Sequence, residues 1–135
     1  LEPTIEAGPP RSYRADNYVL FAGDYYSVTS EHLGPIDAVF DRASLVALDP
    51  ETRMKYVDHM RSLMATGSRM LLLTLSYDQS EMSGPPWSVS GDEVERLYAG
   101  GFDIKHLETH DVTDDQFRIR GLSTIFESAY LLTRE

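Results

Sequence analysis

Apolar residues along this chain gather in short runs separated by polar, glycine- or proline-containing breaks. The run Tyr18–Phe21 is rich in strand-forming residues and stops at a Gly-Asp pair, and Ile36–Phe40 follows a Gly-Pro break. Each run predicts a short buried strand. Met70–Leu75 is almost entirely apolar, which is typical of a parallel strand that is covered on both faces. These three runs predict the framework of an open sheet.

Helical periodicity lies between the strand-like runs. Asp49 as N-cap and Pro50 at the first helical position predict a helix start. Apolar residues then recur at three- and four-residue spacing until Gly67, so this helix is expected to end near Ala65. A shorter amphipathic helix is expected over 94–98, closed by a pair of glycines.

The two ends of the chain differ in pattern. Alternation predicts strands at Phe102–Leu107 and Thr124–Leu132. Residues 1–15 carry three prolines and a glycine without any period, which predicts an irregular tail or linker. The expected order is strand, strand, helix, strand, helix, strand, strand, which places the chain in the α/β class.

Composition narrows the class of protein further. A length of 135 residues with 41% apolar content suits one compact domain over 1–135. The net charge of −10 argues against a nucleic-acid partner, because phosphate binding needs a basic surface. The chain has no cysteine and no apolar run long enough to cross a bilayer, so we expect no membrane segment and a cytoplasmic protein. The histidines show no ligand spacing, and no metal site is expected.

Candidate chemistry gathers where predicted strands end. Asp41 and Arg42 close one strand and Tyr77 closes the next, which places all three at the carboxyl edge of the sheet, where open α/β folds bind ligands. Arg42 there serves either a substrate or a structural ion pair, and Asp41 holds the loop or Arg42. Pro86 and Trp87 form a stiff apolar loop, which offers either a stacking surface for a flat ligand or an ordinary surface turn.

Four blocks of sequence resemble the thiopurine S-methyltransferase family, in the family's order and at similar spacing. The blocks are Ile36–Leu48, Leu72–Asp78, Gly84–Val89 and Ala129–Thr133, and the resemblance extends over roughly Tyr18 to Glu135. It implies the C-terminal part of a Rossmann-like methyltransferase fold, with a mostly parallel sheet and a final antiparallel strand. The family's N-terminal glycine-bearing turn, which cradles S-adenosylmethionine, has no counterpart here, so the domain is expected to be incomplete.

The resemblance also implies roles for individual residues. Arg42 is expected to contact a thiol acceptor as catalytic and substrate-binding residue, with Tyr77, Pro86, Trp87 and one of two later arginines around the same substrate. These two arginines are Arg118 and Arg120. A cofactor role is implied for Asp24, Tyr25 and Asp41, although Asp24 also reads as an ordinary turn aspartate.

The implied function is transfer of a methyl group from S-adenosyl-L-methionine to the sulfur of a small thiol such as a thiopurine. For bacterial relatives the resemblance also implies selenium or tellurium species as acceptors. The complete protein is expected to act as a monomer on a small-molecule thiol. Two alternatives remain: a non-catalytic binding module that lacks the cofactor half, and an unrelated nucleotide-binding α/β domain. The latter is disfavoured because the chain has no phosphate-binding loop.

The expected sheet contains one physical difficulty. In the family's sheet, two strands that this chain lacks separate the Tyr18 strand from the Ile36 strand. A strand without its neighbour leaves unpaired N–H and C=O groups, each costing about 1–3 kcal/mol when buried. The 135-residue chain is therefore not expected to be the complete stable fold.

Overall fold

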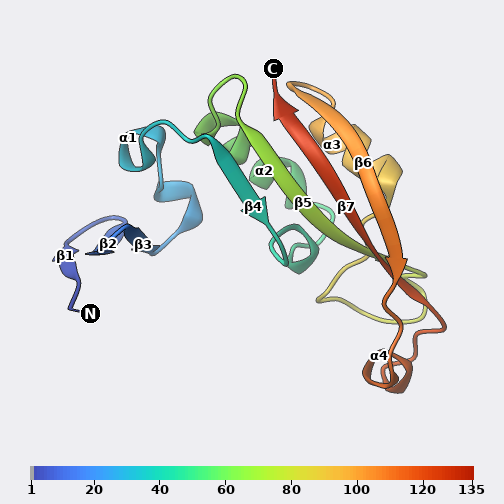
Figure 1. Cartoon of the computed structure of the whole chain (residues 1–135). Helices are drawn as coiled ribbons and strands as arrows, with labels where there is room; N and C mark the ends of the chain where they lie inside the picture. The colour runs from blue at the N-terminus through green and yellow to red at the C-terminus, as the bar shows by residue number, and fades with distance from the viewer. Residues whose placement is uncertain (1) are drawn as a thin grey trace. The chain divides into compact units, whose positions relative to one another are not determined.

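A computed structural model describes residues 2–135, which form two compact units that divide between Pro35 and Ile36 (Figure 1). The first unit is a small antiparallel sheet in the order β1-β2-β3, followed by two short helices. Its elements are β1 (Thr4–Glu6), β2 (Arg11–Ala15), β3 (Tyr18–Ala22), η1 (Tyr25–Ser27) and α1 (Ser30–Leu33).

This sheet corrects two expectations. Residues 1–15 are not irregular throughout, because β1 and β2 occupy part of that range, and β2 pairs with all five residues of β3 across a turn in which Asp16 adopts φ of 50°. The Tyr18 strand exists and is paired, but it is exposed, with Tyr18 at 78%. Pattern reading missed β1 and β2 because their exposed and mostly polar residues show no apolar alternation.

The second unit holds a four-stranded sheet in the order β4-β5-β7-β6. Its elements are β4 (Ala38–Asp41), η2 (Leu45–Ala47), α2 (Arg53–Leu63), β5 (Arg69–Tyr77), α3 (Gly91–Tyr98), β6 (Phe102–Asp111), α4 (Asp115–Ile119) and β7 (Ile125–Arg134). Strand β4 is parallel to β5, and β7 runs antiparallel to both of its neighbours, β5 and β6. The mixed α/β sheet with a last strand inserted antiparallel is therefore confirmed.

The helices confirm the periodic pattern but shift its boundaries. Helix α2 begins at Arg53, because the Asp49 carboxylate accepts hydrogen bonds from the backbone of Glu51 and Thr52 and so caps the turn before the helix. Ser90 caps α3 by accepting from Glu93 N at 3.2 Å. Helix α4 was not predicted, since its five residues give no periodic signal.

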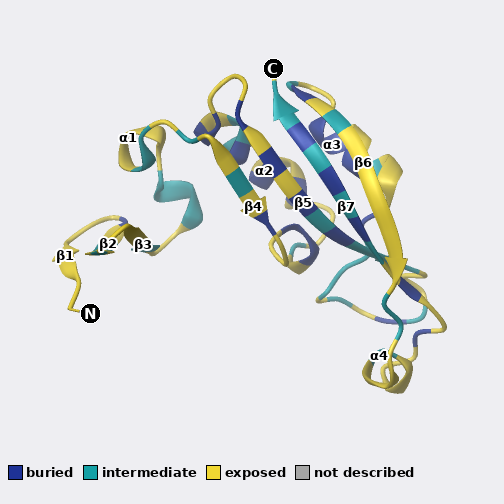
Figure 2. Ribbon diagram, viewed as in Figure 1, coloured by how far each residue is buried: buried dark blue, intermediate teal, exposed yellow. Residues whose placement is uncertain are grey.

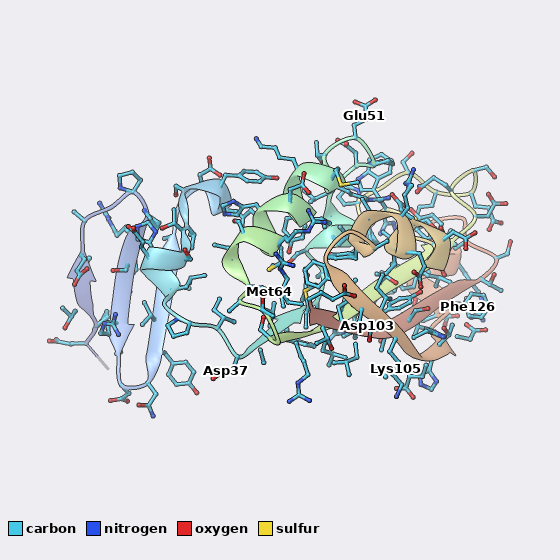
Figure 3. The ribbon with its side chains drawn as sticks, turned by 90° about the horizontal axis from the view of Figure 1, so that it is seen from above. Asp37, Glu51, Met64, Asp103, Lys105 and Phe126 are labelled. Atoms are coloured by element: carbon cyan, nitrogen blue, oxygen red, sulfur yellow. The ribbon has the colours of Figure 1, made fainter. Side chains whose placement is uncertain are left out.

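The sheet of the second unit is covered on one face. Helices α2 and α3 lie on the same side of it (Figure 3). Along β5, Met70, Leu72 and Thr74 are buried, whereas Leu71 is 37% exposed and its partner Phe40 on β4 is 64% exposed (Figure 2). The expectation that β5 is covered on both faces is thus wrong for the described residues. No helix among residues 2–135 has the length and apolar character needed to cross a membrane.

Candidate functional site

The site is built around the turn that follows β4. Strand β4 ends at Asp41, and the chain then reverses through Ala43, whose φ of 66° is uncommon for a residue with a side chain. Arg42 lies between them and is exposed, and its guanidinium makes no hydrogen bond or ion pair with any described residue. A structural ion pair for Arg42 is therefore not found, and the cation is available to a ligand.

Arg42 borders a partly open pocket of about 170 Å³. The other lining residues come from η2, the middle of β5 and β7: Ala43, Val46, Leu73, Thr74, Leu75 and Glu127. Glu127 pairs with Leu75 in the sheet, so the inserted strand β7 brings a carboxylate to the arginine's pocket. The pocket therefore has mostly apolar walls with one cation and one carboxylate in its lining, which suits a small apolar ligand whose polar group can bind Arg42.

Asp41 lies on the helix-covered side of the sheet and serves an internal partner. It is 2% exposed, and Tyr56 Oη donates a hydrogen bond of 2.7 Å to its Oδ2, while Oδ1 has no hydrogen-bond partner. Burial raises the pKa of Asp41, against the opposing hydrogen bond from Tyr56 and a weaker contribution from the Ser44 side chain. The expectation that Asp41 holds Arg42 is not met, because Asp41 is bonded to α2 instead.

The raised pKa of Asp41 gives a pH prediction. The native state holds the Asp41 proton more tightly than the unfolded chain does, so this group's contribution to stability falls as pH rises from about 3.9, the ordinary carboxyl value, through the raised native pKa. Asp41→Asn, which keeps an acceptor for Tyr56, should therefore be more stable than wild type at pH 7, and the gain should shrink at lower pH. Urea unfolding across pH measures this, and a gain independent of pH would contradict it.

The Trp87 segment lies directly beside the Arg42 turn. Trp87 N donates to Val46 O at 2.6 Å, and Val46 lines the Arg42 pocket. Tyr77 Oη donates to Pro86 O at 2.6 Å, so the tyrosine at the end of β5 fixes the proline loop. The structure thus brings Arg42, Tyr77, Pro86 and Trp87 into one region at the carboxyl edge of the sheet.

Of the two later arginines, only Arg120 reaches this region. Its Nη2 donates to Pro85 O at 3.1 Å, whereas Arg118 pairs with Asp115 within α4 at 3.2 Å. The α4 segment is also anchored to the proline loop by a hydrogen bond from the Ser123 hydroxyl to Glu81 and by a small apolar cluster. Its buried members are Met82, Leu122 and Ile125.

The two remaining candidates, Asp24 and Tyr25, belong to the first unit. Asp24 follows β3 and caps η1, since its Oδ1 accepts a hydrogen bond of 2.9 Å from Tyr26 N. Tyr25 is half-buried, and its ring meets that of Tyr26 edge-on, with centroids 5.1 Å apart. The turn role of Asp24 is thus observed, and its Oδ2 makes no hydrogen bond within the described residues.

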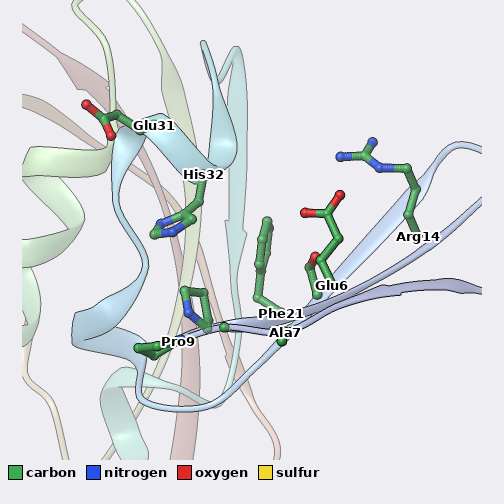
Figure 4. A pocket seen from close by; sticks show the side chains of 10 residues that line it. Glu6, Ala7, Pro9, Arg14, Phe21, Glu31 and His32 are labelled. Atoms are coloured by element: carbon green, nitrogen blue, oxygen red, sulfur yellow. The ribbon is translucent and has the colours of Figure 1, made fainter.

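A different pocket in the first unit contains none of the predicted site residues. It has a volume of about 510 Å³ and is bordered by Glu6, Arg14, Phe21, Glu31 and His32 (Figure 4). The described residues contain no group of three or more histidine, aspartate or glutamate side chains placed to hold a metal ion.

Sequence reasoning missed Glu127, Tyr56 and Arg53. Glu127 approaches the site only through the pairing of β7 with β5, which no local pattern reveals. Arg53 was detectable in principle, because it stands three residues before Tyr56 in phase with the apolar stripe of α2, and an arginine in such a stripe indicates a buried cation with partners.

Comparison with known proteins gives a consistent family. The model of the family "Thiopurine S-methyltransferase (TPMT)" matches residues 2–135. A thiopurine S-methyltransferase of Nitrosospira multiformis is 48% identical over 120 residues, and one of Pseudomonas aeruginosa is 42% identical over 137 residues. These matches cover 87% and 99% of this chain but 54% and 63% of the relatives, so the chain spans little more than half the length of the relatives it matches.

Solved structures show the fold. CrArsM, an arsenic(III) S-adenosylmethionine methyltransferase from Chlamydomonas reinhardtii, superposes with a TM-score of 0.54 at 18% identity, over 80% of this chain and 42% of that chain. A structure from work on conversion of a disulfide bond into a thioacetal group during echinomycin biosynthesis gives 0.58 at 13% identity, over 84% and 54%. The sheet of the second unit is thus of the methyltransferase type.

Proposed function

Because this chain belongs to the thiopurine S-methyltransferase family, we propose that it supplies the acceptor-binding side of an enzyme that methylates the sulfur of a small acidic thiol. The observation that carries the proposal is the unpaired, exposed guanidinium of Arg42 at the rim of an apolar pocket. A thiopurine is a flat ring whose thiol ionises readily, and it matches both features. Selenium and tellurium species are soft nucleophiles, as a thiolate is, so the assay should include them as acceptors.

Methyl transfer requires mainly that the protein positions the acceptor against the cofactor. S-adenosylmethionine, when bound, supplies a methyl group on a positively charged sulfur. Arg42 would hold the acceptor as thiolate, because a nearby cation lowers a thiol pKa, and its planar fork orients the ring. Trp87 and Pro86 would pack against the ring and exclude water. An acceptor that is bound as the thiolate requires no general base.

Fewer residues of this chain are proposed to act on the cofactor. Asp24 and Tyr25, placed directly after β3, would bind the adenine amino group and pack on the ring. Asp41, which is buried and bonded to Tyr56, would act on the site through the backbone of its loop.

Methyl transfer tests the function directly. The intact protein, supplied with radiolabelled S-adenosylmethionine, should label 6-mercaptopurine and leave a matched purine that lacks the thiol unlabelled. If neither compound is labelled but the thiopurine still binds, the enzyme proposal is wrong and the protein is a non-catalytic binding module.

Loss of the Asp24 carboxylate should weaken cofactor binding. In the intact protein, Asp24→Ala is expected to reduce affinity for S-adenosylhomocysteine by about 1–2 kcal/mol, the scale of a hydrogen bond to a charged acceptor. Isothermal titration calorimetry measures this, with Asp16→Ala in the neighbouring turn as control. If both variants bind as tightly as wild type, Asp24 serves only as the cap of η1.

A further inference from the structure

Arg53 is a buried cation that joins three segments of the chain. It is 1% exposed at the first residue of α2. Its Nε donates to Leu48 O at 3.2 Å, its Nη1 to Glu93 Oε1 at 2.7 Å and its Nη2 to Ser88 O at 3.3 Å. All the nitrogens of the guanidinium therefore have protein partners, and none of these partners lies on the same segment as another.

Two of these partners belong to segments that meet at Val46, a residue of the Arg42 pocket, to whose carbonyl Trp87 N donates. Leu48 closes the η2 segment, which begins at the Arg42 turn, and Ser88 directly follows Trp87. The third, Glu93, lies on α3, is 14% exposed and also meets Arg96 at 3.5 Å. The guanidinium thus lies between the Arg42 segment and the Trp87 segment and is braced against α3.

Stability alone does not account for a cation in this place. Removing a guanidinium and a carboxylate from water costs several kcal/mol per ion, and an apolar pair of similar volume is often as stable. An apolar pair cannot fix the orientation of its neighbours, because its contacts are not directional. The guanidinium donates in a rigid plane, so three bonds at fixed angles define both the spacing and the relative orientation of their acceptors.

We propose that Arg53 is a positioning residue that fixes the Arg42 segment and the Trp87 segment at the separation the acceptor needs. The proposal rests on the acceptor site assigned above. The placement of Trp87 can nevertheless be tested without any reaction, because Trp87 is the only tryptophan in the chain. Its fluorescence therefore reports the Trp87 segment alone.

The test compares Arg53→Lys and Arg53→Met with a matched core variant. Lysine keeps the charge near Glu93 but cannot donate to Leu48 O and Ser88 O at once, so both variants should shift the Trp87 emission to the red and raise its quenching by acrylamide. Val57→Ala, which removes buried volume from the same helix at a side chain 0% exposed, should lower the melting temperature without moving the emission. All spectra are taken well below the melting temperature of each variant.

Turnover adds a second readout. In the intact enzyme the Arg53 variants should raise KM for the thiol acceptor by roughly tenfold or more, within the ~100-fold that a misplaced site can cost, with unchanged affinity for S-adenosylhomocysteine. Folded Arg53 variants with wild-type emission and quenching, or an equal shift in Val57→Ala, would overturn the proposal. If wild type methylates no thiol, the proposed function fails while the fluorescence still decides the role of Arg53.

Discussion

Replacing Arg42 with alanine should lower kcat/KM for an acidic thiopurine by roughly 1.5–3 kcal/mol, the range of a charge-assisted hydrogen bond, which is about 10- to 150-fold. The expected cause is loss of the only cation that lines the pocket beside η2 and β5. Arg42→Lys should recover part of the loss, because an ammonium supplies the charge but not the planar fork. Steady-state kinetics on the intact enzyme measure both variants.

The site offers a matched control for this prediction. Arg69 is also exposed and makes no side-chain hydrogen bond or ion pair among the described residues, but it stands at the amino end of β5, the opposite edge of the sheet. Arg69→Ala should leave kcat/KM unchanged. Affinity for S-adenosylhomocysteine should remain at the wild-type value in all three variants. A fall in melting temperature for Arg42→Ala, with normal kcat/KM in the folded fraction, would make Arg42 a structural residue.

Leu72→Ala should be among the most damaging substitutions for stability. Leu72 is 0% exposed in the central strand β5, and truncating such a leucine costs about 2–5 kcal/mol through lost burial and the cavity left behind. Native domains are stable by only about 5–15 kcal/mol. Urea unfolding followed by Trp87 fluorescence should therefore show a much lower midpoint at an unchanged slope.

The neighbouring leucine provides the comparison. Leu71 lies on the same strand but points to the uncovered face and is 37% exposed, so Leu71→Ala should cost no more than about 1.5 kcal/mol, less than full burial of a leucine side chain provides. Equal losses for the two variants would mean that both faces of β5 are covered in solution, for instance by a second molecule.

Strands with an apolar run or an apolar alternation were predictable from the sequence, and those with neither were not. The run Met70–Leu75 is long and apolar enough to predict β5. An apolar run before Asp41 likewise predicts that a strand ends at this residue. The pair β1-β2 and helix α4 escaped prediction because their residues are exposed and form no apolar stripe.

The residues of the candidate site also include some that the sequence predicts and some that it does not. Arg42 and Trp87 follow from their positions after strand ends and from the family resemblance, and the structure brings their segments together through Val46. The contribution of Glu127 depends on which strand lies beside β5, and the contribution of Arg53 depends on three backbone segments that meet only in the folded chain. Properties of this kind are set by tertiary contacts, and no window of sequence contains them.

The position of β7 also has a consequence for how the protein is made. Strand β7 follows β6 in the sequence but lies between β5 and β6 and pairs with both, so every hydrogen bond that joins β6 to the rest of this sheet waits until β7 has been made. During synthesis one edge of β5 and one edge of β6 must remain unpaired, and open to association with other chains, until β7 emerges from the ribosome. Folding of this sheet should accordingly be slow, since pairings distant in sequence pay the loop-closure entropy first.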